Sequence, residues 1–534
     1  MRNVNFSRLL PFGLVLLLGL VGCEGPCCPP PKCQNLVELS YDEQMDCLAP
    51  KPINELYVYY DSSISCSSAD LDLLANLSVS RAAFTPDPNQ PCQARIAEIL
   101  KIMERVNEAT DTEERLSIRR NCGCNMFLLG FPGDEAQNIV IPRETIIASN
   151  QELDHQGGGS GGVGLNFEIS MVLDPNSDSM PSGWKPPENY KDLIQEILEK
   201  LLAFNVKKWH QKAYPLLYVS SQDSLRVMSL TSSPLVRIGL IDTGVDVEHP
   251  GFQVNSSAFQ GWEGNTNSCY IDTSYVLPAF NSRVENGLDD VMDFTGHGTH
   301  IAGILALPPK PSGAAVYSTP SNLRILSVKI TEEESRSTDL FSAVCGMRYA
   351  VEQGVDIMNL SWGFHADTVP EILRMVSKQA ADSGILMVAA AGNLGILVDS
   401  VPHWPSGLSV DPVVGNSVIS VGALATTGSS PTLSEASNYG TGSVQVAAPG
   451  TNICSIYIDG EYLQSTGTSM ATPFITRWAA ALKMSDMNLS GSDLKSLIVN
   501  NGELIELRGN QPIEFGAVQY TGELQTGSGC ASTP

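Results

Sequence analysis

The chain has 534 residues, and its acidic residues outnumber its basic residues by 58 to 32, which gives a formal net charge of −26. This charge argues against a nucleic-acid partner, because phosphate binding needs clustered lysine and arginine side chains. Hydrophobic residues make up 43% of the chain and charged residues 17%, a composition that excludes disorder throughout, and the length favours several domain-sized pieces.

The N-terminal segment has the pattern of an export signal. Arg2 and Arg8 precede an apolar run over residues 9–22, which is shorter than the ~20 residues of a membrane-spanning helix. The run ends in Leu-Val-Gly-Cys at Cys23, which resembles the bacterial lipoprotein signal. The resemblance implies removal of residues 1–22 and attachment of lipid to the Cys23 sulfur. The alternative is ordinary cleavage nearby without a lipid.

These alternatives place the protein differently. A lipid on Cys23 would anchor it to a membrane of the bacterial cell envelope, and Glu24 after the cysteine favours the outer membrane in a two-membraned bacterium. Without the lipid, the chain would be secreted after processing. Twelve cysteines remain after Cys23, and an exported chain can oxidise them, so disulfides are expected, although their connectivity cannot be deduced.

The first half of the chain has an irregular pattern of elements. Residues 23–52 are rich in cysteine and proline and indicate a spacer. The glycine-rich segment Gly157 to Gly164 indicates a flexible insert. Aromatic and β-branched content predicts strands, and apolar residues at helical spacing predict helices. The resulting order is a strand over 55–60, a helix through 96–106, a strand over 125–131, a helix through 193–202 and a strand over 216–220.

From about Leu235 the pattern changes to apolar strands that alternate with helices. Such near-continuous apolar runs suit a parallel sheet with helices on both faces, and ligand sites in such sheets lie beyond the carboxyl ends of the strands. The strands are predicted over 235–242, 323–330, 355–361, 385–391 and 417–423, and the helices include 339–353 and 370–383.

Four polar residues near these strands are candidates for chemistry, and each is ambiguous alone. Asp242 at a strand end is more often a turn former. His297 has His300 three residues later, but this pair lacks the third ligand of a zinc site. Asn393 lies in a turn bounded by glycines. Ser469 could simply cap a helix.

The segments around these four residues carry much more information together. They read DTGVDVEHPGF, GHGTHIAGI, VAAAGN, ASNYG, VAAPGTNICS and GTSMATP, and they resemble signatures of the subtilase family. The chain order Asp, His, Ser is that of subtilisin. The resemblance covers about residues 235–500. It implies a subtilisin-like fold and a serine endopeptidase that hydrolyses peptide bonds through an acyl-enzyme.

The chemistry of the four residues agrees with this resemblance. His297 would accept the proton of the Ser469 hydroxyl, which is a poor nucleophile until a base does so. Asp242 would hold the imidazole in the required tautomer. The Asn393 side chain and the Ser469 backbone N–H would stabilise the oxyanion of the tetrahedral intermediate. No cofactor is required for these steps.

The resemblance also implies substrate contacts. The segment Asn-Leu-Ser-Trp-Gly places Ser361, Trp362 and Gly363 along an extended peptide or protein substrate, which would pair with the backbone as an added strand. Residues 332–334 are three glutamates on the opposite side. They would favour basic residues upstream of the cleaved bond, or they form a solvated acidic loop.

Calcium is a second implication, because several subtilases bind it. The acidic segment over residues 285–293 contains the candidates Asp289, Asp290 and Asp293. Their spacing matches no complete calcium-binding loop. The resemblance thus leaves structural calcium as an expectation, but the residues themselves assign no metal site.

Subtilases are commonly made with a propeptide that assists folding and inhibits the active site. Residues 53–230 fit such an α+β domain, with the order strand, helix, strand, strand, helix, strand, although they are about twice the usual length. The alternative is a permanent disulfide-bonded binding module. Cleavage near 221–236 would identify a propeptide, and a lipid on Cys23 would then anchor the propeptide alone. The peptidase domain is expected over 231–508, followed by a tail over 509–534.

The chain departs from the family pattern after Pro473. Where the family usually has His-Val-Ala-Gly, this chain has Phe474, Ile475, Thr476 and Arg477, followed by Trp478. Bulky side chains there predict altered helix packing beneath the site. An alternative function is that of a catalytically impaired binding lipoprotein with a subtilase fold, which would typically have lost a triad residue.

Overall fold

The computed structural model divides the chain into two compact units. The smaller unit, Met1–Cys47 and Asp178–Lys208, includes most of helix α2 (Tyr41–Leu48). All other described elements belong to the larger unit. The structure describes residues 40–49, 52–60, 87, 90–110, 115–122, 125–131, 139–155, 161–170, 213–217, 235–247, 249, 292–306, 323–331, 337–425, 432–500 and 504–508.

The larger unit contains a seven-stranded sheet in the order β14-β13-β11-β9-β6-β7, with β15 also paired with β13. All pairs are parallel except β13 with β14. The five predicted strands are confirmed, and the short strands β14 and β15 were not predicted. The bounds are β6 (Val236–Asp242), β7 (Leu323–Lys329), β9 (Ile357–Leu360), β11 (Leu386–Ala390), β13 (Val418–Ala425), β14 (Thr432–Leu433) and β15 (Val446–Pro449).

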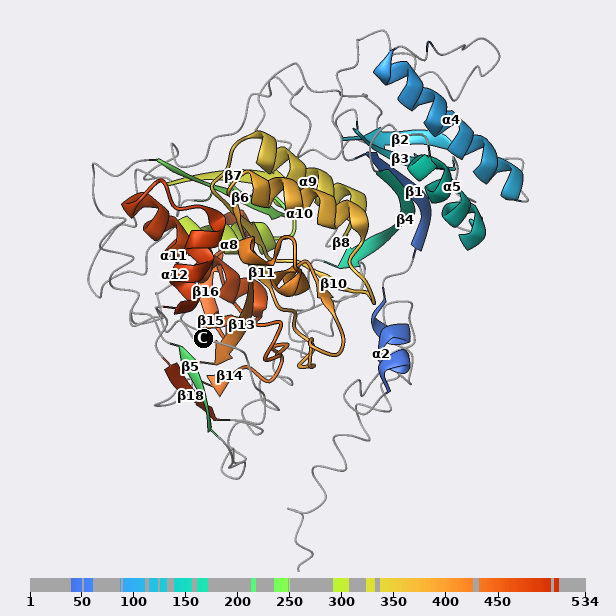
Figure 1. Ribbon diagram of the computed structural model, residues 1–534. Helices are drawn as coiled ribbons and strands as arrows, with labels where there is room; N and C mark the ends of the chain where they lie inside the picture. Colours follow the sequence, from blue (N-terminus) through green and yellow to red (C-terminus); the bar gives the residue numbers. More distant parts are fainter. Residues whose placement is uncertain are drawn as a thin grey trace, which may run out of the picture. The chain divides into compact units, whose positions relative to one another are not determined.

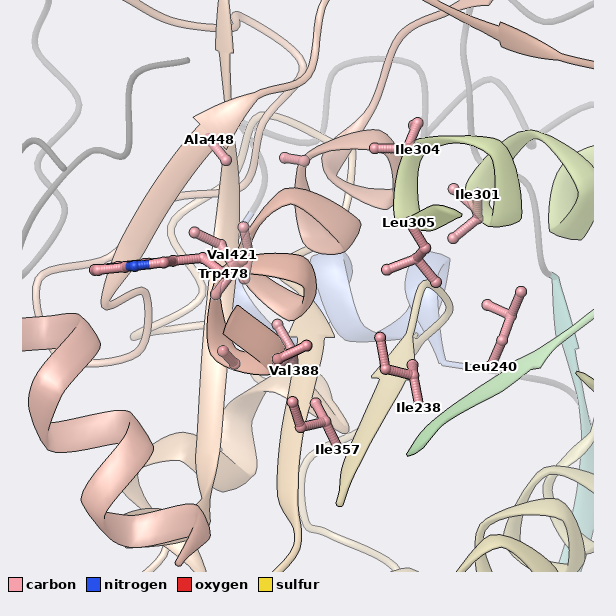
Figure 2. Close-up of a cluster of buried hydrophobic side chains, with 14 of the residues drawn as sticks. Ile238, Leu240, Ile301, Ile304, Leu305, Ile357, Val388, Val421, Ala448 and Trp478 are labelled. Atoms are coloured by element: carbon pink, nitrogen blue, oxygen red, sulfur yellow. The ribbon is translucent and has the colours of Figure 1, made fainter. Parts of the chain in front are cut away.

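Helices cover both faces of this sheet, as predicted (Figure 1). In β11, Leu386 and Val388 enter the core beneath α8 (His297–Ala306), α11 (Thr468–Ser485) and α12 (Gly491–Asn500). The intervening Met387 and Ala389 enter the core beneath α9 (Leu340–Glu352) and α10 (Glu371–Asp382). Figure 2 shows residues of the first core. Because successive strand side chains point to opposite faces, an uninterrupted apolar strand fills both cores.

Short elements connect the sheet and its helices. They are β10 (Phe364–His365), β12 (His403–Trp404), β16 (Ile453–Ile456), β17 (Tyr462–Ser465), η11 (Ser406–Val410), η12 (Gly415–Ser417) and η13 (Ile458–Gly460).

No helix in the described part of the chain is long and apolar enough to cross a membrane.

A smaller α+β domain precedes the peptidase sheet. Its antiparallel strands have the order β2-β3-β1-β4, and one face packs against α4 and α5. The predicted strand over 55–60, helix through 96–106 and strand over 125–131 correspond to β1, α4 and β3, whereas β2, α5 and β4 were not predicted. With them the domain has the order strand, helix, strand, strand, helix and strand, which is complete by Ser170. The bounds are β1 (Pro52–Tyr60), α4 (Pro91–Ala109), β2 (Ser117–Asn121), β3 (Met126–Gly130), α5 (Arg143–His155) and β4 (Gly161–Ser170).

The last two elements predicted for this domain have other outcomes. The predicted helix over 193–202 lies outside the described residues. The strand predicted over 216–220 corresponds to β5 (Ala213–Leu217), which pairs antiparallel with β18 (Leu504–Arg508) near the other end of the chain. It therefore does not belong to the β1–β4 sheet.

The prediction of a flexible insert over residues 157–164 is wrong for Gly161 to Gly164. These residues form the start of β4, where Gly162 pairs with Tyr59 and Gly164 pairs with Tyr57. A Cβ on Gly164 would lie 2.2 Å from the Tyr57 hydroxyl oxygen, so the glycine lets the tyrosine ring lie across the neighbouring strand.

The β1–β4 sheet continues into the peptidase domain. Strand β8 (Ser337–Asp339), which precedes α9, pairs antiparallel with β4. On the face opposite α4 and α5, Tyr57, Leu128 and Ile169 share a core with α9 and α10. The small sheet is thus buried on both faces, once by its own helices and once by the peptidase domain.

Candidate active site

Asp242 and His297 meet at the carboxyl edge of the parallel sheet. Asp242 is the last residue of β6, and His297 is the first residue of α8. His297 Nδ1 and Asp242 Oδ1 are 2.7 Å apart, and the Thr243 backbone N–H donates to the same oxygen at 2.8 Å. Because a carboxylate accepts hydrogen bonds, this contact places the imidazole proton on Nδ1 and a lone pair on Nε2.

Asp293 organises the turn that precedes α8. Its Oδ1 accepts hydrogen bonds from the Thr295 and Gly296 backbone N–H groups, both at 2.9 Å, and from Thr243 Oγ1 at 3.0 Å. Its Oδ2 accepts from the Thr299 backbone N–H and hydroxyl, both at 2.8 Å. A calcium ion bound by Asp293 would compete with these donors, which already fix the first turn of the histidine-bearing helix.

Ser469 is the second residue of α11 and is 7% exposed. Pro473 lies four residues later and has no N–H, so the helix cannot supply the usual donor to the Ser469 carbonyl. Ser361 replaces that donor, because its hydroxyl donates to the Ser469 carbonyl oxygen at 3.0 Å. In return, Ser469 Oγ donates to the Ser361 carbonyl oxygen at 3.1 Å. The start of α11 is thereby tied to the segment after β9.

Asn393 lies in the loop after β11, close to the start of α11. The Thr468 backbone N–H and hydroxyl donate to Asn393 Oδ1 at 2.7 and 2.9 Å. These bonds assign the side-chain oxygen and leave the Nδ2 group as the donor end of the amide. Asn438 braces the same loop, because it accepts from the Leu394 N–H and donates to the Ala391 carbonyl, both at 2.9 Å.

A buried chain of hydrogen bonds continues behind Ser469. Thr476 Oγ1 donates to Asn359 Oδ1 at 2.8 Å, and Asn359 Nδ2 donates to Ser361 Oγ at 2.9 Å. Ser361 Oγ is the atom that donates to the Ser469 carbonyl. All three supporting side chains are fully buried. Thr476 is one of the departures from the usual family pattern, so this part of the support depends on a departure.

Two further departures are Arg477, which reaches the far end of α8 from His297, and Trp478. Arg477 is buried, and its Nη1 contacts the Ile304 carbonyl at 3.5 Å, where a positive charge suits the C-terminal turn of α8. Trp478 belongs to the same buried cluster as Val421 (Figure 2). Arg477 thus packs against α8, whereas Trp478 packs with residues of the sheet.

Two of the residues predicted to bind substrate, Trp362 and Gly363, are closely packed against other parts of the peptidase domain. The Trp362 side chain is 2% exposed and lies in the core beneath α9 and α10, so a substrate contact by this residue has to use its backbone. A Cβ on Gly363 would lie 2.2 Å from His403 Cε1, so the Gly363 backbone rests directly on that imidazole. His403 was not predicted, because its position follows from the pairing of β10 with β12.

His300 does not combine with His297 into a metal site. Its Nε2 lies 3.0 Å from both the Ile453 and Leu463 carbonyl oxygens, so it carries the ring proton. Burial lowers the pKa of His300 to about 4, which keeps the imidazole neutral. Among the described residues, no group of three or more His, Cys, Asp or Glu side chains could hold a metal ion.

The four candidates thus come from separate motifs to one edge of the sheet. Asp242 bonds directly to His297, and Ser469 and Asn393 are joined through Thr468. A hydroxyl at a helix start, an imidazole oriented by a carboxylate and an amide donor are the groups that acyl transfer requires. The remaining predictions, Cys23, Asp289, Asp290 and residues 332–334, lie outside the described residues.

Comparison with known proteins shows the family of this part of the chain. The sequence profile of the subtilase family matches residues 235–518. Over 250 residues the chain is 33% identical to the major intracellular serine protease of Bacillus subtilis (strain 168), which covers 46% of this chain and 68% of that protein. It is 32% identical over 253 residues to the thermophilic serine proteinase of Bacillus sp. (strain AK1), covering 47% of this chain and about half, 53%, of that relative.

Among solved structures, a cold-adapted subtilisin-like serine proteinase matches 53% of this chain and 88% of its own, with 24% identity and a TM-score of 0.38. The profile match spans more than half of the chain and includes all four candidate residues. The chain belongs to the subtilase family and is a subtilisin-like serine endopeptidase.

Proposed function

We propose that Asp242, His297 and Ser469 form the catalytic triad of this endopeptidase, and that Asn393 donates to the oxyanion. The observation that carries the proposal is the 2.7 Å contact between His297 Nδ1 and Asp242 Oδ1. It sets the tautomer in which Nε2 can accept the Ser469 proton. The alternative, a binding lipoprotein with an impaired site, would typically have lost one of these residues, and all three are present.

The proposed reaction follows from these groups. His297 Nε2 takes the proton as Ser469 Oγ attacks the peptide carbonyl, and Asp242 stabilises the resulting imidazolium. The Asn393 amide and the Ser469 backbone N–H, at the start of α11, stabilise the oxyanion. Collapse of the tetrahedral intermediate expels the amine, which receives the proton from His297. Water then hydrolyses the acyl-enzyme by the same steps.

The proposed substrates are proteins or peptides in an extended conformation. The backbone of Ser361 to Gly363 would pair with the substrate as an added strand. Ser361 links the two parts of the site, because it contacts Ser469 through both its carbonyl and its hydroxyl. Substrate pairing there would therefore occur beside the nucleophile.

The N-terminal domain, predicted over residues 53–230, is proposed to be an inhibitory propeptide. Two observations support its docking on the peptidase domain. Asn166 Oδ1 accepts from the Phe341 N–H in the first turn of α9, at 3.1 Å. Arg120 Nη2 lies 2.8 Å from Asp339 Oδ2, and Asp339 also caps α9. Mass spectrometry of the mature protein tests this role, since an N-terminus within 221–236 indicates a propeptide and an intact N-terminal half indicates a permanent module.

Export to a bacterial cell envelope is the proposed location, with a lipid on Cys23 or secretion after processing. The signal-like N-terminus supports export, whereas the name of the Bacillus subtilis relative places that relative inside the cell. Metabolic labelling with a radioactive fatty acid, compared with a Cys23→Ser variant, distinguishes the lipid-anchored form from the secreted form.

Hydrolysis of a protein substrate by wild-type chain and by Ser469→Ala tests the catalytic proposal. The expected loss in kcat is about 10⁶, the size measured for removal of the nucleophile in subtilisin. Ser485→Ala, near the end of the same helix, is the matched control and should retain activity. Full activity in Ser469→Ala would refute the proposed nucleophile, and an inactive wild type after removal of the N-terminal domain would favour the binding lipoprotein.

A further inference from the structure

Two cysteines face each other across the boundary between the N-terminal domain and the peptidase domain. Cys122 follows β2, and Cys345 lies on α9. Both are free thiols, and the Cys345 thiol is hydrogen-bonded to that of Cys122. Cys345 is buried in the core shared by the two domains, and the half-buried Cys122 packs against that core. Neither residue has a role in the proposed catalysis.

Backbone and side-chain contacts hold this pair from both sides. Arg348, one turn after Cys345 on α9, donates from Nη1 to the Cys122 carbonyl at 2.9 Å. The Cys122 backbone N–H donates to the Met126 carbonyl at 2.9 Å. Nearby, Arg120 Nη1 donates to Ser342 Oγ at 2.6 Å. The two sulfur atoms are thus brought together by an ordered interface, not by a chance encounter of surface side chains.

We propose that Cys122 and Cys345 are a disulfide site that covalently joins the N-terminal domain to the peptidase domain, with a small-molecule disulfide as the oxidant. The same chain already holds other cysteines, Cys47, Cys92 and Cys454, in disulfides. The proposed bond differs from an ordinary structural disulfide, because it connects two domains across the segment in which propeptide processing is expected.

The reaction proceeds by two exchange steps. The Cys122 thiolate attacks one sulfur of the small disulfide, which forms a mixed disulfide and releases one small thiol. Cys345 then loses its proton to solvent and attacks the Cys122 sulfur, which releases the second small thiol. Two protein thiols and one small disulfide become one protein disulfide and two small thiols.

The order of the two steps follows from exposure. Burial raises the pKa of the Cys345 thiol well above its usual value, and the neighbouring Cys122 thiol adds to the rise. The Cys345 thiolate is therefore rare, and the more accessible Cys122 meets the oxidant first.

The disulfide would keep the two domains linked after proteolytic processing. Cleavage between the domains breaks the chain, but the disulfide keeps the N-terminal domain on α9. The peptidase domain would then remain attached to whatever anchors the N-terminal half, including a lipid on Cys23. This consequence rests on the proposed propeptide role, whereas the disulfide itself does not.

Peptide mapping of the full-length Ser469→Ala chain tests the proposal without any processing. The protein is incubated with oxidised or reduced glutathione, unfolded in N-ethylmaleimide and digested. The expected result is a linked peptide containing Cys122 and Cys345 in the oxidised sample, which reduction removes. In the Cys345→Ser control, Cys122 should carry glutathione instead.

Recovery of both cysteines as N-ethylmaleimide adducts after oxidation would overturn the proposal, and so would a Cys122 link to any other cysteine. Electrophoresis of processed wild-type protein gives the functional readout. The two fragments should migrate together without reductant and separate with it, and Cys345→Ser should separate in both conditions. If no processing occurs, the propeptide role fails, but the peptide map still decides the disulfide.

Discussion

The two helical faces of the peptidase sheet differ in what completes them. On the face of α8 and α11, the groups that hold Ser469 come from the peptidase sequence itself, namely Ser361, Asn359 and Thr476. On the face of α9 and α10, the N-terminal domain contributes part of the core and caps the first turn of α9 through Asn166.

This difference separates catalysis from regulation. Removal of the N-terminal domain leaves the described contacts of the Ser469 hydroxyl and carbonyl in place. The same removal takes away the Asn166 acceptor of the Phe341 N–H and exposes apolar side chains of α9 to water, and the apolar exposure costs free energy. We therefore expect changes on the first face to alter kcat and changes on the second face to alter domain docking.

The largest expected effect within these predictions is at Asn393. Removal of one oxyanion donor in subtilisin costs about 10²–10³ in kcat, so Asn393→Ala should lose a similar factor. Steady-state kinetics with a peptide substrate measures this loss, with little change expected in KM. Asn393→Asp keeps the acceptor for Thr468 but has no donor, and it should lose at least as much. Wild-type kcat in both variants would exclude the oxyanion role.

Acid should destabilise the peptidase domain through buried histidines. Burial lowers the pKa of His300 and of His365 to about 4 from the ordinary 6.5. The unfolded chain therefore binds protons between these values while the folded chain does not. Stability present above about pH 6.5 should fall as the pH approaches 4, by on the order of 3 kcal/mol for each histidine.

Urea unfolding at a series of pH values measures this dependence. His365→Gln should flatten the fall in the unfolding midpoint, because one proton-binding group is removed from the unfolded chain. A midpoint that stays constant from pH 6.5 to 4.5 in the wild type would show that the buried histidines do not control acid stability.

Docking of the N-terminal domain on the face of α9 and α10 can be weakened at Arg120. Its guanidinium bridges Asp339 and Ser342 across the domain boundary, so Arg120→Met should weaken docking by about 2 kcal/mol. Faster cleavage of the N-terminal domain by an added protease measures the effect, with kcat of the released peptidase unchanged. Arg374→Met is the control, because it removes a pair with Asp411 inside the peptidase domain. Equal cleavage rates for all three proteins would contradict the proposed docking contact.

The smallest predicted effect concerns Thr476, on the face of α8 and α11. Thr476→Val keeps the shape of the side chain but removes its hydrogen bond to Asn359. One such bond contributes about 1 kcal/mol, so a loss of roughly fivefold in kcat is expected. KM should not change, and Thr476→Ser should restore the wild-type value. A change in KM alone would place Thr476 in substrate binding instead of nucleophile support.

Much of the peptidase fold was predictable, because its strands are apolar runs and its four candidate residues follow recognisable motifs. The two hydrogen bonds between Ser361 and Ser469 were not predictable, because they depend on how the segment after β9 approaches α11. In that helix Pro473 has no N–H to donate to the Ser469 carbonyl. Composition was misleading at Gly162 and Gly164, where tyrosines on the neighbouring strand, not chain flexibility, explain the glycines.

Activation of the Ser469 nucleophile by His297 is the basis of the proposed catalysis. Labelling with a fluorophosphonate after removal of the N-terminal domain tests it most directly, with mass spectrometry to locate the adduct. We expect an adduct on Ser469 that is lost in Ser469→Ala and forms much more slowly in His297→Ala. A wild-type chain that stays unlabelled, or an adduct on another residue, would contradict it.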